Sequence, residues 1–116
     1  MAPSEAARMV RPPYFVLEDD DVSAYADYSA IKKHLEPVDV KNGVYRIFDS
    51  TGKEIAVHVI EGRVDIGDPI GNDPEHLAQT LRRFLESVSQ QWGINGAQVA
   101  RAELPQLVEQ FTGRVR

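Results

Sequence analysis

Three short turn sequences within residues 38–67 constrain the fold of this chain more than any other feature. Each ends in glycine and lies between stretches rich in β-branched residues, as β-hairpin turns do. Asn-Gly is the strongest short hairpin signal, because a type I′ turn needs a positive φ at both central residues. The sequence therefore predicts a four-stranded antiparallel meander over 38–67. The turns are Asn42-Gly43, Ser50-Thr51-Gly52 and Glu61-Gly62.

The three turns predict strand registers that agree with one another. Because side chains alternate between the two faces of a strand, a slip of one residue would invert every assignment. The expected opposite pairs are Val40 with Tyr45 and Val38 with Ile47 at the first turn, Ile47 with Ile55 and Tyr45 with Val57 at the second, and Val59 with Val64, His58 with Asp65 and Val57 with Ile66 at the third. All three registers send one apolar set to the same face: Val38, Val40, Tyr45, Ile47, Ile55, Val57, Val59, Val64 and Ile66.

The second face of the predicted meander is mixed in character. Its apolar members are Val44, Phe48, Ala56 and Ile60, and its polar members are Asp39, Arg46, Glu54, His58, Arg63 and Asp65. An exposed apolar group with a polar rim is typical of a protein interface. Two alternatives stay open: this face is an interface, or a helix covers it and the domain has three layers.

Composition excludes several classes of site. The chain has 116 residues, enough for one domain with its own core, and no cysteine, which excludes disulfides, thiolate metal sites and cysteine nucleophiles. Its net charge of −5 and the lack of a basic patch predict no nucleic-acid binding. No apolar run reaches the ~20 residues that span a bilayer, and no signal peptide is evident, so we expect no membrane association and a cytoplasmic location.

The segments before the meander are predicted as follows. Residues 1–13 are small, polar and proline-bearing and are expected to be a disordered leader, with residues 14–116 forming a single α+β domain. Residues 14–18 are predicted to be a strand at an edge of the meander, beside either the Val38 or the Val64 strand. The acidic run at 18–21 favours a solvated loop before a helix over a metal site, since it lacks spaced ligands. A helix is predicted over 22–35, ended by Pro37.

A long helix is predicted over residues 74–92. Asp73 caps it, Pro74 occupies its first position and Gly93 is its left-handed stop. Its apolar stripe is four turns long and consists of Leu77, Leu81, Phe84, Leu85, Val88 and Trp92. We expect this helix to cover the apolar face of the meander.

Residues 94–116 are predicted to be a helical C-terminal extension. Pro105 marks a helix start, and Leu104, Leu107, Val108 and Phe111 form a second short stripe. Packing of this stripe on the domain itself is favoured over docking on a partner. The predicted fold class is thus α+β, an antiparallel sheet of four or five strands with two or three helices, in the order β-α-β-β-β-β-α-α.

Candidate chemistry is sparse, and no motif for a metal, cofactor or nucleotide is present. His58 opposite Asp65 could form a base-and-orienter pair, but no nucleophile accompanies it, so catalysis is not the favoured interpretation. The pair more often stabilises a sheet surface.

Three functional hypotheses follow. The first is a protein-interaction module, homodimeric or neutralising a partner, as its size and acidity would allow for a bacterial toxin-neutralising protein. Its expected interface residues are Val44, Arg46, Phe48, Ile60, Leu104, Leu107 and Phe111. The second is a small-molecule or lipid binder in a pocket between sheet and helix. The third is a small enzyme that uses His58 and Asp65.

Overall fold

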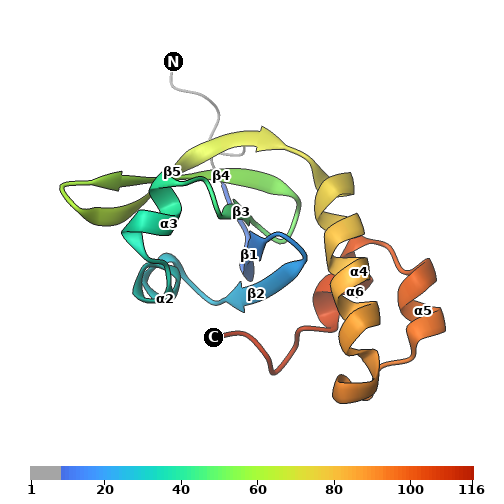
Figure 1. Cartoon of the computed structure of the whole chain (residues 1–116). Helices are drawn as coiled ribbons and strands as arrows, with labels where there is room; N and C mark the ends of the chain where they lie inside the picture. Colours follow the sequence, from blue (N-terminus) through green and yellow to red (C-terminus); the bar gives the residue numbers. More distant parts are fainter. Residues whose placement is uncertain (1–8) are drawn as a thin grey trace.

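The computed structural model describes residues 9–116, in which two groups of helices sandwich part of a five-stranded antiparallel sheet (Figure 1). The fold class is α+β, as predicted. The spatial order of the strands is β2-β1-β3-β4-β5. The strands are β1 (Tyr14–Glu18), β2 (Asp21–Tyr25), β3 (Arg46–Phe48), β4 (Lys53–Ile60) and β5 (Arg63–Asn72). The helices are α2 (Tyr28–His34), α3 (Pro37–Lys41), α4 (Pro74–Trp92), α5 (Gly96–Arg101) and α6 (Leu104–Glu109).

The predicted hairpin at Glu61-Gly62 is confirmed. Both turn residues have positive φ angles, 52° and 75°, as the type I′ geometry requires. β4 and β5 pair with Val59 opposite Val64, His58 opposite Asp65 and Val57 opposite Ile66, which is the register that the turn predicts. Beyond this point two bulges shift the register near Ile55.

The turn between β3 and β4 is also confirmed. Ile47 lies opposite Ile55, and the backbone N–H of Asp49 donates to the carbonyl of Lys53 at 2.9 Å, which closes the three-residue loop. Gly52 has a φ of 96°, the left-handed conformation expected of the last loop residue. The predicted apolar face over β3, β4 and β5 is confirmed, with Ile47 and Ile55 buried and Val57, Val59, Val64 and Ile66 partly buried.

The first predicted hairpin is wrong. Residues 37–41 form α3 instead of a strand, because Pro37 occupies the first turn of a helix, and Asn42-Gly43 follows its end. Gly43 has the positive φ of 69° that favoured a hairpin, but the same angle suits the chain reversal after a helix. Val38, expected in the core opposite Ile47, is 58% exposed, and Tyr45 lies just before β3, outside the paired residues.

β1 lies beside β3, in the position predicted for the Val38 strand. It pairs with β3, with Val16 opposite Ile47, and on its other side it pairs with β2. The strand at 14–18 is thus confirmed, but neither predicted neighbour is correct. Four consecutive buried residues in β1 mark a strand that is covered on both faces.

The predicted helix over 22–35 is correct only in its second half. Val22 and Ala24 belong to β2, which returns along β1 after a turn in which Asp19 has a φ of 53°. The acidic run therefore precedes a strand and not a helix. Asp27 caps the real helix α2, since its carboxylate accepts the N–H of Ala30 at 2.8 Å.

The helix over 74–92 has the predicted bounds and caps. Asp73 accepts the N–H of His76, Pro74 begins the helix and Gly93 ends it with a φ of 68°. Its predicted contact is wrong, because α4 packs against the opposite face of the sheet, on Phe15 and Phe48. The face that α4 was expected to cover is covered by α2 and α3, whose Ile31 and Val40 pack with Ile47 and Ile55.

The C-terminal helices pack on the chain itself, as favoured. Leu107 and Phe111 are fully buried in the same core as α4. Phe111 lies 5.1 Å from Phe15 and 5.5 Å from Trp92 between ring centroids, both in edge-on geometry. This aromatic cluster joins the segment after α6 to β1 and to α4.

The leader predicted at 1–13 falls largely on residues 1–8, which lie outside the described part of the chain. Residues 9–13 run beside the β3–β4 turn and are tied to it. Arg11 donates its N–H to the carboxylate of Asp49 at 3.0 Å, and its carbonyl accepts the N–H of Ser50 at 2.9 Å. Asp49 is fully buried at the centre of these contacts.

Candidate functional site

The β4–β5 arm, residues 53–72, is covered on one face only among the described residues. Its inner face, with Val57, Val59, Val64 and Ile66, packs beside α2 and α3. On the outer face Ile60 is 52% exposed, and His58 and Asp65 keep 47% and 42% of their side-chain surface. Figure 1 shows the hairpin end of the arm on the side of the molecule away from α4, α5 and α6, while the other end of β5 leads into α4. We call this outer surface the open face; its residues are Ala56, His58, Ile60, Arg63, Asp65 and Gly67.

His58 and Asp65 form the pair that the register predicts. The Nε2 atom of His58 lies 3.0 Å from Oδ2 of Asp65 across the β4–β5 ladder. Gly67 makes room for this ring, since a Cβ atom there would lie 3.2 Å from Cε1 of His58. The pair lies on an exposed sheet surface, and the described residues contain no group of three or more metal-ligating side chains of the His, Asp and Glu type.

Arg46 continues the charged surface onto β3. Its Nε and Nη2 atoms donate to the two carboxylate oxygens of Glu54 at 3.0 and 2.8 Å, a bidentate ion pair. These hydrogen bonds raise the pKa of Arg46. Alternating charges therefore run from β3 to β5, with the apolar side chain of Ile60 near the tip of the arm.

The structure separates the predicted interface residues. Arg46 and Ile60 are exposed, and Val44 is half-buried at the wall of a cavity of about 250 Å³ between the sheet and α4, together with Arg46, His76 and Arg83. Phe48, Leu107 and Phe111 are fully buried in the chain's own core, and Leu104 is half-buried against it. A partner has access to the first group and not to the buried residues.

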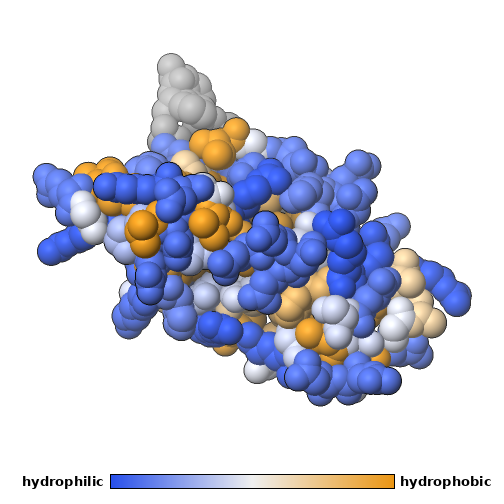
Figure 2. All heavy atoms as spheres, in the orientation of Figure 1, coloured by the Kyte–Doolittle hydropathy of each residue, from blue (hydrophilic) through white to orange (hydrophobic). Residues whose placement is uncertain are grey.

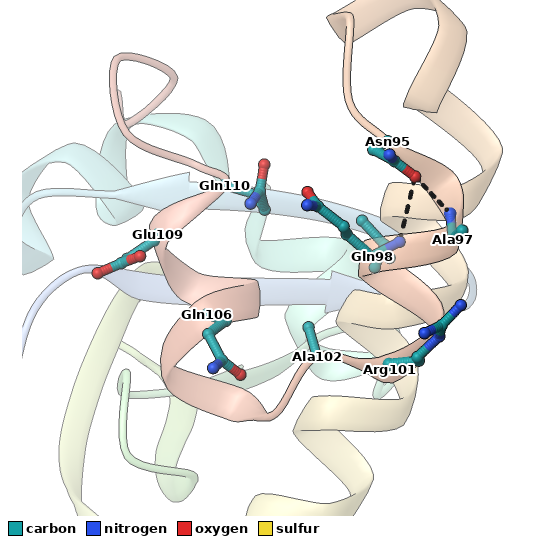
Figure 3. Close-up of a pocket in the computed structure, with 9 residues that line it drawn as sticks. Asn95, Ala97, Gln98, Arg101, Ala102, Gln106, Glu109 and Gln110 are labelled. Atoms are coloured by element: carbon teal, nitrogen blue, oxygen red, sulfur yellow. Dashed lines mark hydrogen bonds between the residues drawn. The ribbon is translucent and has the colours of Figure 1, made fainter.

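A larger hollow of about 500 Å³ lies between α5 and α6. Six of its nine lining residues have polar side chains, and in Figure 3 the side chains of Gln98 and Gln110 extend toward one another while Glu109 points away. Asn95 is engaged as a helix cap, accepting the N–H groups of Ala97 and Gln98. The predicted pocket between sheet and helix corresponds to the smaller cavity, whose lining includes several charged or ionisable side chains and is unsuited to a lipid.

The two edges of the sheet differ. At β2, the N–H of Arg116 donates to the carbonyl of Ala24 at 2.9 Å, and the carbonyl of Arg116 accepts the N–H of Ala26 at 3.0 Å. At β5, no backbone hydrogen bond outside the β4–β5 ladder involves residues 63–72 within the described part of the chain. The sequence does not reveal this asymmetry, because a single backbone bridge at Arg116 leaves no pattern in it.

Hydrophobic side chains over the arm and α3 are scattered among hydrophilic ones and do not merge into a continuous patch in the view of Figure 2. The two most exposed apolar side chains of the arm are Ile60 and Ile70, at 52% and 67%. None of the described helices is both long and apolar enough to cross a membrane. An interface on the arm would therefore use polar side chains and the backbone edge of β5, and not a large apolar surface.

Comparison with protein-family models, with curated proteins and with solved structures finds no match for this chain.

Proposed function

We propose that this protein is a protein-interaction module whose contact surface is the β4–β5 arm, comprising the open face and the outer edge of β5. One observation carries the proposal. β1 is buried on both faces, whereas the arm keeps its outer face and its outer edge free among the described residues. Unpaired strand edges are templates for another chain, and proteins usually cover or block them.

The chemistry of the arm favours a protein over a small molecule. The open face carries both charge signs, in Arg63 and Asp65, and has an apolar side chain in Ile60. A mixture of ionic and apolar contacts is typical of protein partners, whereas small ligands need a concave site. Neither of the two cavities described above is lined by His58 or Asp65, which also disfavours catalysis by that pair.

Site-specific photo-crosslinking tests this proposal. A photoreactive amino acid replaces Ile60 on the open face, and in a matched control it replaces Gln79, an exposed residue of α4. The protein is expressed in its natural host, illuminated and analysed by mass spectrometry. We expect one defined protein adduct, with this chain or another, at position 60 and none at position 79. Equal or absent crosslinking at both positions would contradict the proposal.

A second candidate function is the binding of a small polar molecule in the hollow between α5 and α6. It is favoured by the volume of about 500 Å³ and by the donor and acceptor groups of Gln98 and Gln110. Native mass spectrometry of gently purified protein tests it. Retention of one bound small molecule, lost in a Gln98→Ala and Gln110→Ala double variant, is the expected result, and apo protein alone would contradict it.

A further inference from the structure

The outer edge of β5 presents backbone groups that another strand can bind. A two-residue loop makes Ile60 and Arg63 a hydrogen-bonded pair, and in an antiparallel ladder such pairs alternate along the strand. Arg63 and Asp65 therefore direct their backbone groups toward β4, while Val64 and Ile66 direct theirs away from it. No backbone hydrogen bond to these outward groups occurs within residues 9–116.

The same segment carries one charge of each sign on the open face. Arg63 and Asp65 are two residues apart and so project to the same side of β5. Arg63 makes no side-chain hydrogen bond or ion pair among the described residues, and Asp65 uses only Oδ2, toward His58. One cation and the free carboxylate oxygen of one anion are thus available at the edge.

Three antiparallel registers join the edge to a second copy of itself through the outward residues. With Val64 opposite Ile66, Asp65 faces its own counterpart, a like-charge pair that is destabilising. With Ile66 opposite Ile66, Asp65 faces Gly67 and Arg63 faces Pro69, which leaves both charges unpaired. With Val64 opposite Val64, Arg63 of each copy faces Asp65 of the other, so two opposite-charge pairs form.

The geometry points to a second copy of this chain as the occupant of the β5 edge, paired in the register with Val64 at the two-fold axis. This inference rests on the proposed function, since it names the partner of the same surface. The backbone groups of Val64 and Ile66 supply the hydrogen bonds, and Arg63 binds the free carboxylate oxygen of Asp65 across the interface. The two five-stranded sheets then join at their β5 edges into one sheet that spans both copies.

The assembly stops at two copies. A two-fold pairing uses the β5 edge of both chains, and at the opposite edge Arg116 bonds to the backbone of Ala24 and Ala26 at the end of β2. An isologous contact of this kind closes on itself, whereas a sheet with two open edges would continue into a fibre. The blocked β2 edge and the open β5 edge together favour a dimer.

Charge reversal tests the register. Arg63→Glu places a new carboxylate opposite Asp65 of the other copy, and Asp65→Arg places a second guanidinium opposite Arg63. A homodimer of either single variant therefore contains two like-charge pairs. Sedimentation velocity from micromolar to millimolar protein is expected to show a wild-type dimer and a dissociation constant raised about tenfold or more in each single variant. An equimolar mixture of the two variants is expected to regain affinity as a heterodimer. In that heterodimer one pair joins the two introduced side chains and the other joins the two native ones, so both pairs are again attractive.

Arg83→Glu is the matched control, since it makes the same change of charge on the exposed surface of α4 and should leave the dimer intact. Recovery in the mixture also shows that both variants fold. A wild-type protein that stays monomeric at millimolar concentration, or a dimer that neither reversal weakens, would overturn the inference. If the monomer still crosslinks a different protein through position 60, the proposed function stands and only the identity of the partner is wrong.

Discussion

The backbone N–H of Arg116 donates to the carbonyl oxygen of Ala24 at 2.9 Å, so a residue near the C-terminus occupies the edge of a strand near the N-terminus. The guanidinium of Arg114 helps to hold this segment, lying 4.2 Å from the centre of the Trp92 ring. The end of the β2 edge is thereby closed from within the chain. The other edge, at β5, carries the binding surface that we propose.

Removing residues 114–116 should weaken the fold and expose the β2 edge. The deletion eliminates the two backbone hydrogen bonds of Arg116 and a cation–π contact, which together contribute about 1–3 kcal/mol to the free energy of unfolding. Urea denaturation followed by Trp92 fluorescence measures this loss. Light scattering should in addition detect species larger than a dimer, because both edges are then open. An unchanged free energy of unfolding would show that the bridge at Arg116 is not significant.

Gly52→Ala should strongly destabilise the protein. Gly52 has a φ of 96°, and a Cβ atom there would overlap the Cα of Pro74 and lie 2.8 Å from its nitrogen. Relieving the overlap would separate the β3–β4 turn from the start of α4, where Asp73 donates its N–H to the carbonyl of Gly52. We expect a loss of about 3 kcal/mol in the free energy of unfolding.

Gly43→Ala is the control for this variant. Gly43 also has a positive φ, 69°, but no atom lies within 4 Å of the place its Cβ would take. Only backbone strain then acts, and the expected loss is about 1 kcal/mol. Equal losses in both variants by urea denaturation would contradict the role of the Gly52–Pro74 contact.

Asp49→Ala should cost about 3 kcal/mol or more in the free energy of unfolding. The buried carboxylate accepts N–H groups from Arg11, Thr51 and Lys53 and the hydroxyl of Thr51, at 2.7–3.0 Å. Without it these donors lose their partner inside the protein. Asp39→Ala, which removes one 3.3 Å hydrogen bond from Tyr45, serves as the control and should cost under about 1 kcal/mol. Similar losses in the two variants would argue against a structural role for Asp49.

Stability should fall at alkaline pH. Burial, followed by the charges of Asp49 and Asp27, raises the pKa of Tyr14 above 10.0, and burial also raises the pKa of Tyr28 and of Tyr45. Above pH 10 the tyrosine side chains ionise first in the unfolded protein, which favours unfolding. Their contribution to the free energy of unfolding is therefore complete below that pH and is lost as the pH rises through their pKa in the folded protein.

Urea denaturation below and above pH 10 checks this expectation, and the decline should be smaller in Tyr14→Phe. A free energy of unfolding that increases above pH 10 would contradict the assignment of these raised pKa values.

The elements whose signals are local could be predicted from the sequence. α4 was predicted with its bounds because Asp73, Pro74 and Gly93 determine its ends without help from the rest of the chain. The same holds for the β4–β5 hairpin, where two residues of positive φ determine both the turn and the His58–Asp65 pair. The residues of the open face could therefore be predicted from the sequence, but the segments of the chain that lie beside them could not.

The errors concern signals with two meanings and contacts between distant segments. Pro37 is compatible with the end of one helix, but it begins another, and Asn42-Gly43 follows a helix as readily as it closes a hairpin. Contacts between distant segments determine that β1 pairs with β3 and which face of the sheet α4 covers. No local sequence pattern encodes these contacts. The uninterrupted apolar run of β1 was the available sign of helices on both faces.

Amide hydrogen exchange along β5, measured by NMR at two protein concentrations, tests the central claim most directly. In dilute protein the amides of Arg63 and Asp65 should exchange slowly, because they bond to β4, while those of Val64 and Ile66 exchange rapidly. At high concentration Val64 and Ile66 should become protected as the second copy binds. Protection of all four amides in dilute protein, or rapid exchange of Val64 and Ile66 at both concentrations, would contradict an open β5 edge that another copy of this chain occupies.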